Sequence, residues 1–156
     1  MRMQIVKFLW RVSGRQLSEP LSKRVFAYTA LTSDIQSIGS HIQSMSVLTT
    51  QKAGRGIHYS ATGEREFQEV AALVGRNLAD AVTLLEIYNP EIVRDVLRRE
   101  DVIDGKVRES LSNHLKRFHL RQCSPEAGPI FVEMMGHLER VSDLCNNVAE
   151  YVRDLQ

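Results

Sequence analysis

The sequence is poor in the residues that interrupt helices or cross-link chains. Its 156 residues include four prolines, nine glycines and two cysteines. Cys123 and Cys145 form no C-x-x-C motif and are too few for a disulfide framework, so we expect both to be reduced thiols. The longest apolar run, residues 70–74, is far shorter than the roughly 20 residues of a membrane-spanning helix. These absences argue against a secreted, disulfide-stabilised domain and against a membrane-spanning chain.

The common catalytic motifs are also absent. The sequence contains no G-x-S-x-G, no H-E-x-x-H and no Walker A motif. Di-iron carboxylate bundles carry Glu-x-x-His on two helices, and that spacing occurs nowhere in this chain. We therefore expect a protein that is not an enzyme and that has no catalytic and no cofactor-binding residues.

Positive charge is concentrated near the N-terminus. The net charge of the chain is +1, but eight Lys and Arg against two Asp and Glu give residues 1–60 a net charge of +6. Residues 1–15 also place four apolar side chains on one helical face: Ile5, Phe8, Leu9 and Val12. We predict a basic amphipathic segment at residues 1–17, which either makes a peripheral membrane contact or packs on the main domain at residues 18–156. We expect no nucleic-acid partner.

Helical periodicity dominates the rest of the sequence. Apolar residues at alternating steps of three and four predict long helices over residues 18–50, 63–88, 90–120 and 125–156, with a loop at 51–63. Asn89-Pro90 is a typical helix start, and Ser124-Pro125-Glu126 repeats that signal. The predicted apolar rows are Tyr28, Leu31, Ile35, Ile38, Ile42 and Met45; then Phe67, Ala71, Val74, Leu78, Ala81 and Leu85; and finally Leu138, Val141, Cys145, Val148 and Val152. The pattern predicts an all-α, up-and-down bundle of long antiparallel helices.

The predicted helix at residues 90–120 is unusual because acids interrupt its apolar row. That row reads Leu97, Glu100, Asp104, Val107, Leu111, His114 and Phe118. A buried carboxylate without a partner costs several kcal/mol or becomes protonated, so a counter-ion is expected. Glu139 and Asp143 repeat the same spacing on the last helix. Either a cation held by these four acids or ion pairs with Arg98, Arg99 and Arg140 would satisfy them.

Two segments of the chain resemble each other. Residues 34–45, DIQSIGSHIQSM, align with residues 136–148, GHLERVSDLCNNV, so that three apolar positions coincide. Gln36 falls on Glu139 and Ser40 falls on Asp143, so the earlier copy has neutral polar residues where the later one has acids. Internal similarity of this kind indicates a repeat architecture.

The motifs REDVID and RQCSPEAGPIFVEMMGHLERVSDLCNNVAEYV resemble those of the phosphate-uptake regulator family (PhoU). The resemblance is stronger still to the PhoU-like cytoplasmic domain of bacterial sodium/phosphate cotransporters. Family members carry an L-E-R-I-G-D-H-x-x-N-I-A-E-like run, and Leu138-Glu139-Arg140-Val141-Ser142-Asp143 matches its first part. The resemblance covers about residues 20–155 and implies one complete three-helix repeat plus one preceding helix.

The resemblance also implies a metal site. Family members bind multinuclear metal, often iron or another divalent or trivalent ion, through E/D-x-x-x-D pairs. Residue by residue, this carries over only to Glu100, Asp104, Glu139 and Asp143. Gln36 and Ser40 stand where the first repeat would have its ligands, so one cluster is expected to be missing. No other cofactor is expected.

The function implied by the resemblance is regulation of phosphate transport. The expected partner is a membrane phosphate transporter, contacted in trans by a free-standing regulator or in cis by a cotransporter tail. A homodimer is a second expected assembly, and the expected location is the cytoplasm at the inner face of the membrane. Two alternatives remain: a metal-dependent enzyme that uses the same carboxylates, and a structural helical adaptor.

Overall fold

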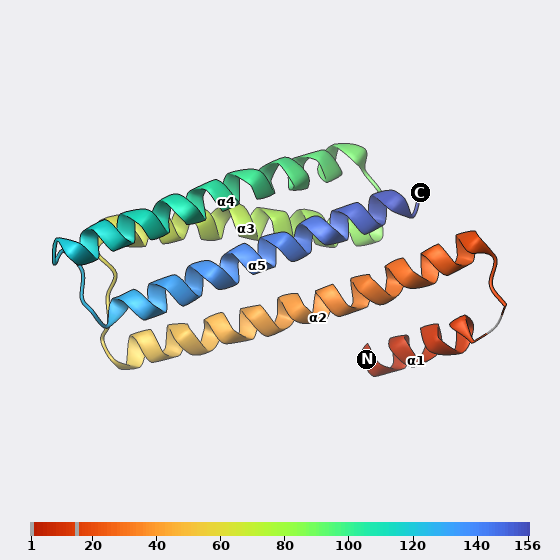
Figure 1. The fold of residues 1–156 in the computed structure, drawn as a ribbon, viewed down its shortest axis with the longest axis horizontal. Helices are drawn as coiled ribbons and strands as arrows, with labels where there is room; N and C mark the ends of the chain where they lie inside the picture. Colours follow the sequence, from red (N-terminus) through yellow and green to blue (C-terminus); the bar gives the residue numbers. More distant parts are fainter. Residues whose placement is uncertain (1, 15) are drawn as a thin grey trace.

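The computed structural model describes residues 2–14 and 16–156, and these form five helices and no strand. The helices are α1 (Arg2–Ser13), α2 (Glu19–Gly54), α3 (Ala61–Glu86), α4 (Pro90–His119) and α5 (Ala127–Asp154). The chain reverses direction at each connection, so successive helices are antiparallel (Figure 1). The all-α, up-and-down architecture predicted from the sequence is confirmed. In the described part of the chain, no helix is both long enough and apolar enough to cross a membrane.

Helix α5 lies at the centre of the arrangement. Helices α3, α4 and α5 pack against one another as a three-helix bundle, and α2 packs on the opposite side of α5. Helix α1 lies along α2, on the side away from α5 (Figure 1). Among the described residues, the backbone of α2 does not closely approach that of α3 or α4, although Lys52 of α2 pairs with Glu64 of α3 at 3.4 Å. Helix α5 therefore provides most of the packing that holds α2 on the three-helix bundle.

Local capping explains where two of the helices begin. Asn89 accepts hydrogen bonds on Oδ1 from the backbone N–H groups of Glu91 (2.8 Å) and Ile92 (3.4 Å), and Pro90 opens α4. Ser60 caps α3 in the same way, since its Oγ accepts from the N–H of Gly63. The predicted loop at residues 51–63 was too long, because α2 continues to Gly54 and leaves only residues 55–60 between the helices.

The apolar rows predicted for α3 and α4 were correct in part. Val74, Ala81, Val107 and His114 are buried as predicted, but the rest of each buried row is displaced by about one residue. Helix α3 buries Gly63, Val70, Val74, Asn77, Ala81 and Leu84, and helix α4 buries Val93, Val96, Ile103, Val107, Ser110, His114 and Arg117. Each of these helices packs against two neighbours, so its buried face is centred between the two contacts. Polar residues such as Asn77 belong to that face, and a pattern of apolar residues alone does not include them.

Only two of the six residues in the row predicted for α2 are buried. Leu31 and Ile38 face α5, whereas Tyr28, Ile35 and Ile42 are more than 40% exposed. The cause is that α2 packs on α5 with one side only. The complete row predicted for α5, in contrast, is buried, because α5 has neighbours on three sides.

A buried ion pair joins the start of α3 to the end of α4. Arg117 donates from Nη1 and Nη2 to the two carboxylate oxygens of Glu66, at 3.1 and 2.7 Å. Asn113 donates to the same carboxylate at 3.0 Å. Both charged side chains are at most 16% exposed, so each depends on the other for solvation. Such a pair fixes the register of two helices even where its net contribution to stability is small.

Replacing Glu66 with Gln is expected to destabilise the fold by about 3 kcal/mol, because it leaves the Arg117 charge buried without a counter-ion. The matched control is Glu69→Gln on the same helix. Glu69 pairs with Lys106 at the surface, so its loss is expected to cost less than about 1 kcal/mol. Urea unfolding of both variants measures the difference, and equal effects would contradict the assignment.

Candidate metal centre

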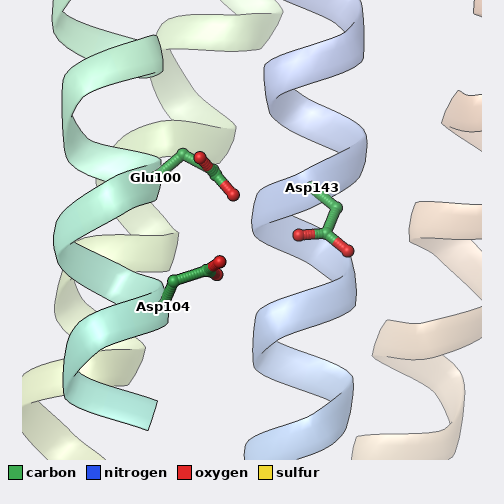
Figure 2. Close-up of side chains that lie close together, drawn as sticks. All are labelled: Glu100, Asp104 and Asp143. Atoms are coloured by element: carbon green, nitrogen blue, oxygen red, sulfur yellow. The ribbon is translucent and has the colours of Figure 1, made fainter. Parts of the chain in front are cut away.

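Three of the four predicted acids converge between α4 and α5. Glu100 and Asp104 lie one turn apart on α4, and Asp143 faces them from α5 (Figure 2). One carboxylate oxygen of each lies within 4.8 Å of the others. In the part of the chain that the structure describes, this is the one group of three or more His, Cys, Asp or Glu side chains with such spacing.

These acids lie at the border of the core. Glu100, Asp104 and Asp143 are each partly exposed, whereas their neighbours Ile103 and Ser142 are completely buried. The prediction that Glu100 and Asp104 occupy the apolar row of α4 was therefore wrong by one position. The displacement leaves the carboxylates beside solvent, where an ion can enter.

Glu139 lies beside the cluster without belonging to the close group of three. Burial raises the pKa of its carboxyl, and the charges of Asp104 and Asp143 raise it further. The pKa of Glu100 is raised by burial first and then by Asp104, Asp101 and Asp143. All four predicted acids thus share one region of negative potential, in which the charges of Asp104 and Asp143 disfavour the ionisation of Glu100 and Glu139.

The arginines neutralise this cluster only in part. Arg140 lies 3.1 Å from Asp143 and Arg108 lies 4.0 Å from Asp104, but both arginine side chains are about 70% exposed. Exposed pairs of this kind contribute little. Arg98 and Arg99, which were the other predicted counter-ions, pair instead with Asp95 and with Asp80.

Asp104 provides the most direct test of whether a cation fits. Its Oδ1 atom is buried and has no hydrogen-bond partner. A buried acceptor without a partner costs about 1–3 kcal/mol, and more when it is charged. Carboxylate oxygens are ligands that hard divalent and trivalent cations prefer, so the three acids fit such an ion.

A polar cleft of about 480 Å³ opens beside the acids. Helix α4 contributes Glu100, helix α5 contributes Arg140, Asp143, Leu144, Asn146 and Asn147, and helix α2 contributes Ser37 and His41. The Nδ1 atoms of His41 and His137 are 2.9 Å apart, which links α2 to α5. Sequence reasoning missed this contribution of α2. The one sequence feature that could have indicated this contribution is that His41 follows the buried Ile38 by three residues and so lies on the same face of α2.

The remaining candidates lie away from the site. Gln36 and Ser40 are exposed on α2, and no acid replaces them there. His114 is a core residue, as predicted, because it is buried and stacks on Phe131 at 5.0 Å between ring centroids. Cys123 and Cys145 are both free thiols, and burial raises the pKa of Cys145 to about 12.

A buried polar network holds the two helices of the site in register. Asn77 of α3 donates from Nδ2 to the Oγ atom of Ser142 at 3.2 Å. Arg99 donates from Nη1 to the Oδ1 atom of Asn77 at 2.6 Å. Ser142 directly precedes Asp143 and Arg99 directly precedes Glu100. The network therefore fixes the axial register of α4 against α5, so that their acids face each other.

Replacing Glu100 with Gln is expected to stabilise the metal-free protein at neutral pH. A carboxyl pKa raised by folding means that ionisation destabilises the folded state, so stability falls as pH rises through that pKa. Removing one like-charge i,i+4 contact contributes about 0.2–0.5 kcal/mol, or about 1–2 °C in Tm. Thermal unfolding checks the result. Glu109→Gln, an exposed acid on the same helix, is the control and should give no gain. A lower Tm for Glu100→Gln would contradict the expectation.

Comparison with known proteins identifies the three-helix bundle. The family model for the PhoU domain matches residues 67–152, which is more than half of the chain and spans most of α3 through α5. Neither a curated protein nor a solved structure gives a significant match. The match is shorter than the resemblance read from the sequence, since it excludes α2. PhoU domains are regulatory, non-enzymatic domains that act in phosphate homeostasis. The chain belongs to the PhoU domain family.

Proposed function

We propose that this chain regulates phosphate transport and that a divalent or trivalent cation, with iron the first candidate, modulates it. Glu100, Asp104 and Asp143 would hold the cation, and Glu139 would add negative charge beside it. The observation that carries the proposal is the buried, unpartnered oxygen of Asp104 within a group of three converging acids. A bound cation would supply the positive charge that the exposed arginines give only in part.

The arrangement of helices suggests how the site acts. The acids belong to α4 and α5, and the cleft beside them is completed by Ser37 and His41 of α2. Because α2 is held on the bundle mainly by α5, the charge on the acids bears on the main contact that holds α2. The proposed output is therefore a change in how α2 packs on α5.

The proposed partner is a membrane phosphate transporter. The role of PhoU domains in phosphate homeostasis supports this choice. The chain would act in trans as a separate regulator or in cis as the cytoplasmic tail of a sodium/phosphate cotransporter, in either case at the inner face of the membrane. A homodimer is a further proposed assembly.

Metal content tests the site. After incubation with iron, manganese or zinc and removal of excess metal, elemental mass spectrometry is expected to find about one ion or more per chain. The Glu100→Gln/Asp143→Asn variant should lose this metal, because two of its three ligands become neutral amides. The Glu86→Gln/Glu109→Gln variant changes the net charge equally at exposed positions and should keep it.

Stability provides a second measurement of the same site. At a metal concentration one hundred times Kd, binding to the folded state stabilises it by about 2.7 kcal/mol. The wild-type protein should gain this stability and the Glu100→Gln/Asp143→Asn variant should not. Absence of metal in the wild-type protein, or equal binding by both proteins, would reject the site and favour the structural adaptor.

Phosphate uptake tests the regulatory role. Cells that lack the chain are expected to take up labelled phosphate at an altered rate, and the wild-type chain should restore the normal rate. The Glu100→Gln/Asp143→Asn variant should restore it less well than the Glu86→Gln/Glu109→Gln control. Unchanged uptake in the deletion strain would contradict the role in transport, and turnover of phosphate esters by the metal-loaded protein would favour the enzyme alternative.

A further inference from the structure

Helix α1 has an outward face that no other described element covers. It packs on α2 alone, with Leu9 buried and Val6 and Val12 partly buried. It lies on the side of α2 away from α5, at the edge of the molecule (Figure 1). The family match begins at residue 67, so α1 lies outside the conserved domain model.

Large exposed apolar side chains flank this outward face. Met3, Phe8 and Trp10 are 70%, 57% and 68% exposed. The predicted apolar face of Ile5, Phe8, Leu9 and Val12 is thus divided, since Leu9 meets α2 while Phe8 remains in solvent. A helix that has already buried one side normally exposes polar residues elsewhere, so exposure of two aromatic rings at the flanks of the outward face indicates a further contact.

Positive charge lies between these apolar side chains. Lys7 and Arg11 are exposed one turn apart, and neither forms an ion pair among the described residues. At about 100° per residue, Phe8 and Trp10 lie about 80° to either side of the line between the two cations. The sequence has no Asp or Glu before Glu19, so nothing acidic in this segment offsets the charge.

We propose that this outward face of α1 docks on an anionic lipid bilayer. Lys7 and Arg11 would contact lipid phosphates, while Trp10, Phe8 and Met3 enter the headgroup region. Aromatic side chains are enriched at that depth, and basic residues are attracted by the negative surface potential of the bilayer. The inference goes beyond the proposed regulatory role and does not depend on the metal site.

Trp10 is the single tryptophan of the chain and reports on its own environment. The full chain is mixed with phosphatidylcholine vesicles that contain or lack phosphatidylserine. The fluorescence of Trp10 is expected to shift to the blue when the anionic vesicles are added, and the protein is expected to sediment with them. Both effects should weaken as salt is added. The Lys7→Gln/Arg11→Gln variant should bind about thirtyfold more weakly, since each basic side chain near the surface contributes about fivefold.

The matched control is Arg65→Gln/Arg76→Gln, which removes the same charge from exposed positions on α3. This control should bind as the wild type does, and circular dichroism confirms that each variant folds. Equal binding by wild type and Lys7→Gln/Arg11→Gln would overturn the proposal, as would sedimentation with vesicles but no shift of Trp10 fluorescence. Absence of vesicle binding, with dimerisation lost on Trp10→Ser, would also overturn it and assign the face to a second copy of the chain.

Discussion

Helix α5 packs against α2, α3 and α4 at once, and the other helices take their positions from it. It buries 13 of its 28 residues, whereas α2 buries only four of 36. Such burial requires small residues where neighbours come close. A Cβ atom at Gly128 would lie 3.1 Å from the Nε2 atom of His114, which must shift to admit a side chain. Because α5 packs against three helices, most of its positions tolerate only apolar or small residues. The positions that carry its acids lie at the border of this buried surface.

The position of the acids follows from this packing. Asp143 directly follows the buried Ser142, and Glu100 directly follows Arg99, so the hydrogen-bonded network through Asn77 sets the height of both. The carboxylates then meet beside solvent, with the Oδ1 atom of Asp104 buried and unpartnered. The same helix contacts α2 beside these acids, through His137 and Asn147. The candidate site and the attachment of α2 are thus connected through one rigid element.

The parts of the fold that were predictable from the sequence are those determined by local rules. The buried row of α5 is fully apolar, and the Asn89-Pro90 start of α4 is satisfied within its own first turn, so both were predicted correctly. The rows of α3 and α4 depend on two neighbours each, and polar Asn77 completes one of them. Tyr28, Ile35 and Ile42 carry the same periodic signal as buried residues but are exposed, because periodicity records which residues share a face and not what covers it.

The candidate site was predictable to a similar extent. Spacing and the resemblance indicated four acids, and the structure brings Glu100, Asp104 and Asp143 together with Glu139 beside them. The cleft and the His41–His137 contact were not predictable, because they depend on the rotation of α2 about its own axis against α5. Metal binding itself stays a prediction, because acids on two adjacent helices converge in the same way in a cluster that holds no cation.

The central claim is that Glu100, Asp104 and Asp143 are ligands of one cation centre. Anomalous diffraction from crystals grown with iron or manganese tests it most directly, because the anomalous signal locates the metal atom and identifies the element. The account predicts a peak between α4 and α5, within bonding distance of carboxylate oxygens from all three residues. A map with no peak there, or with metal bound only elsewhere on the chain, would contradict it.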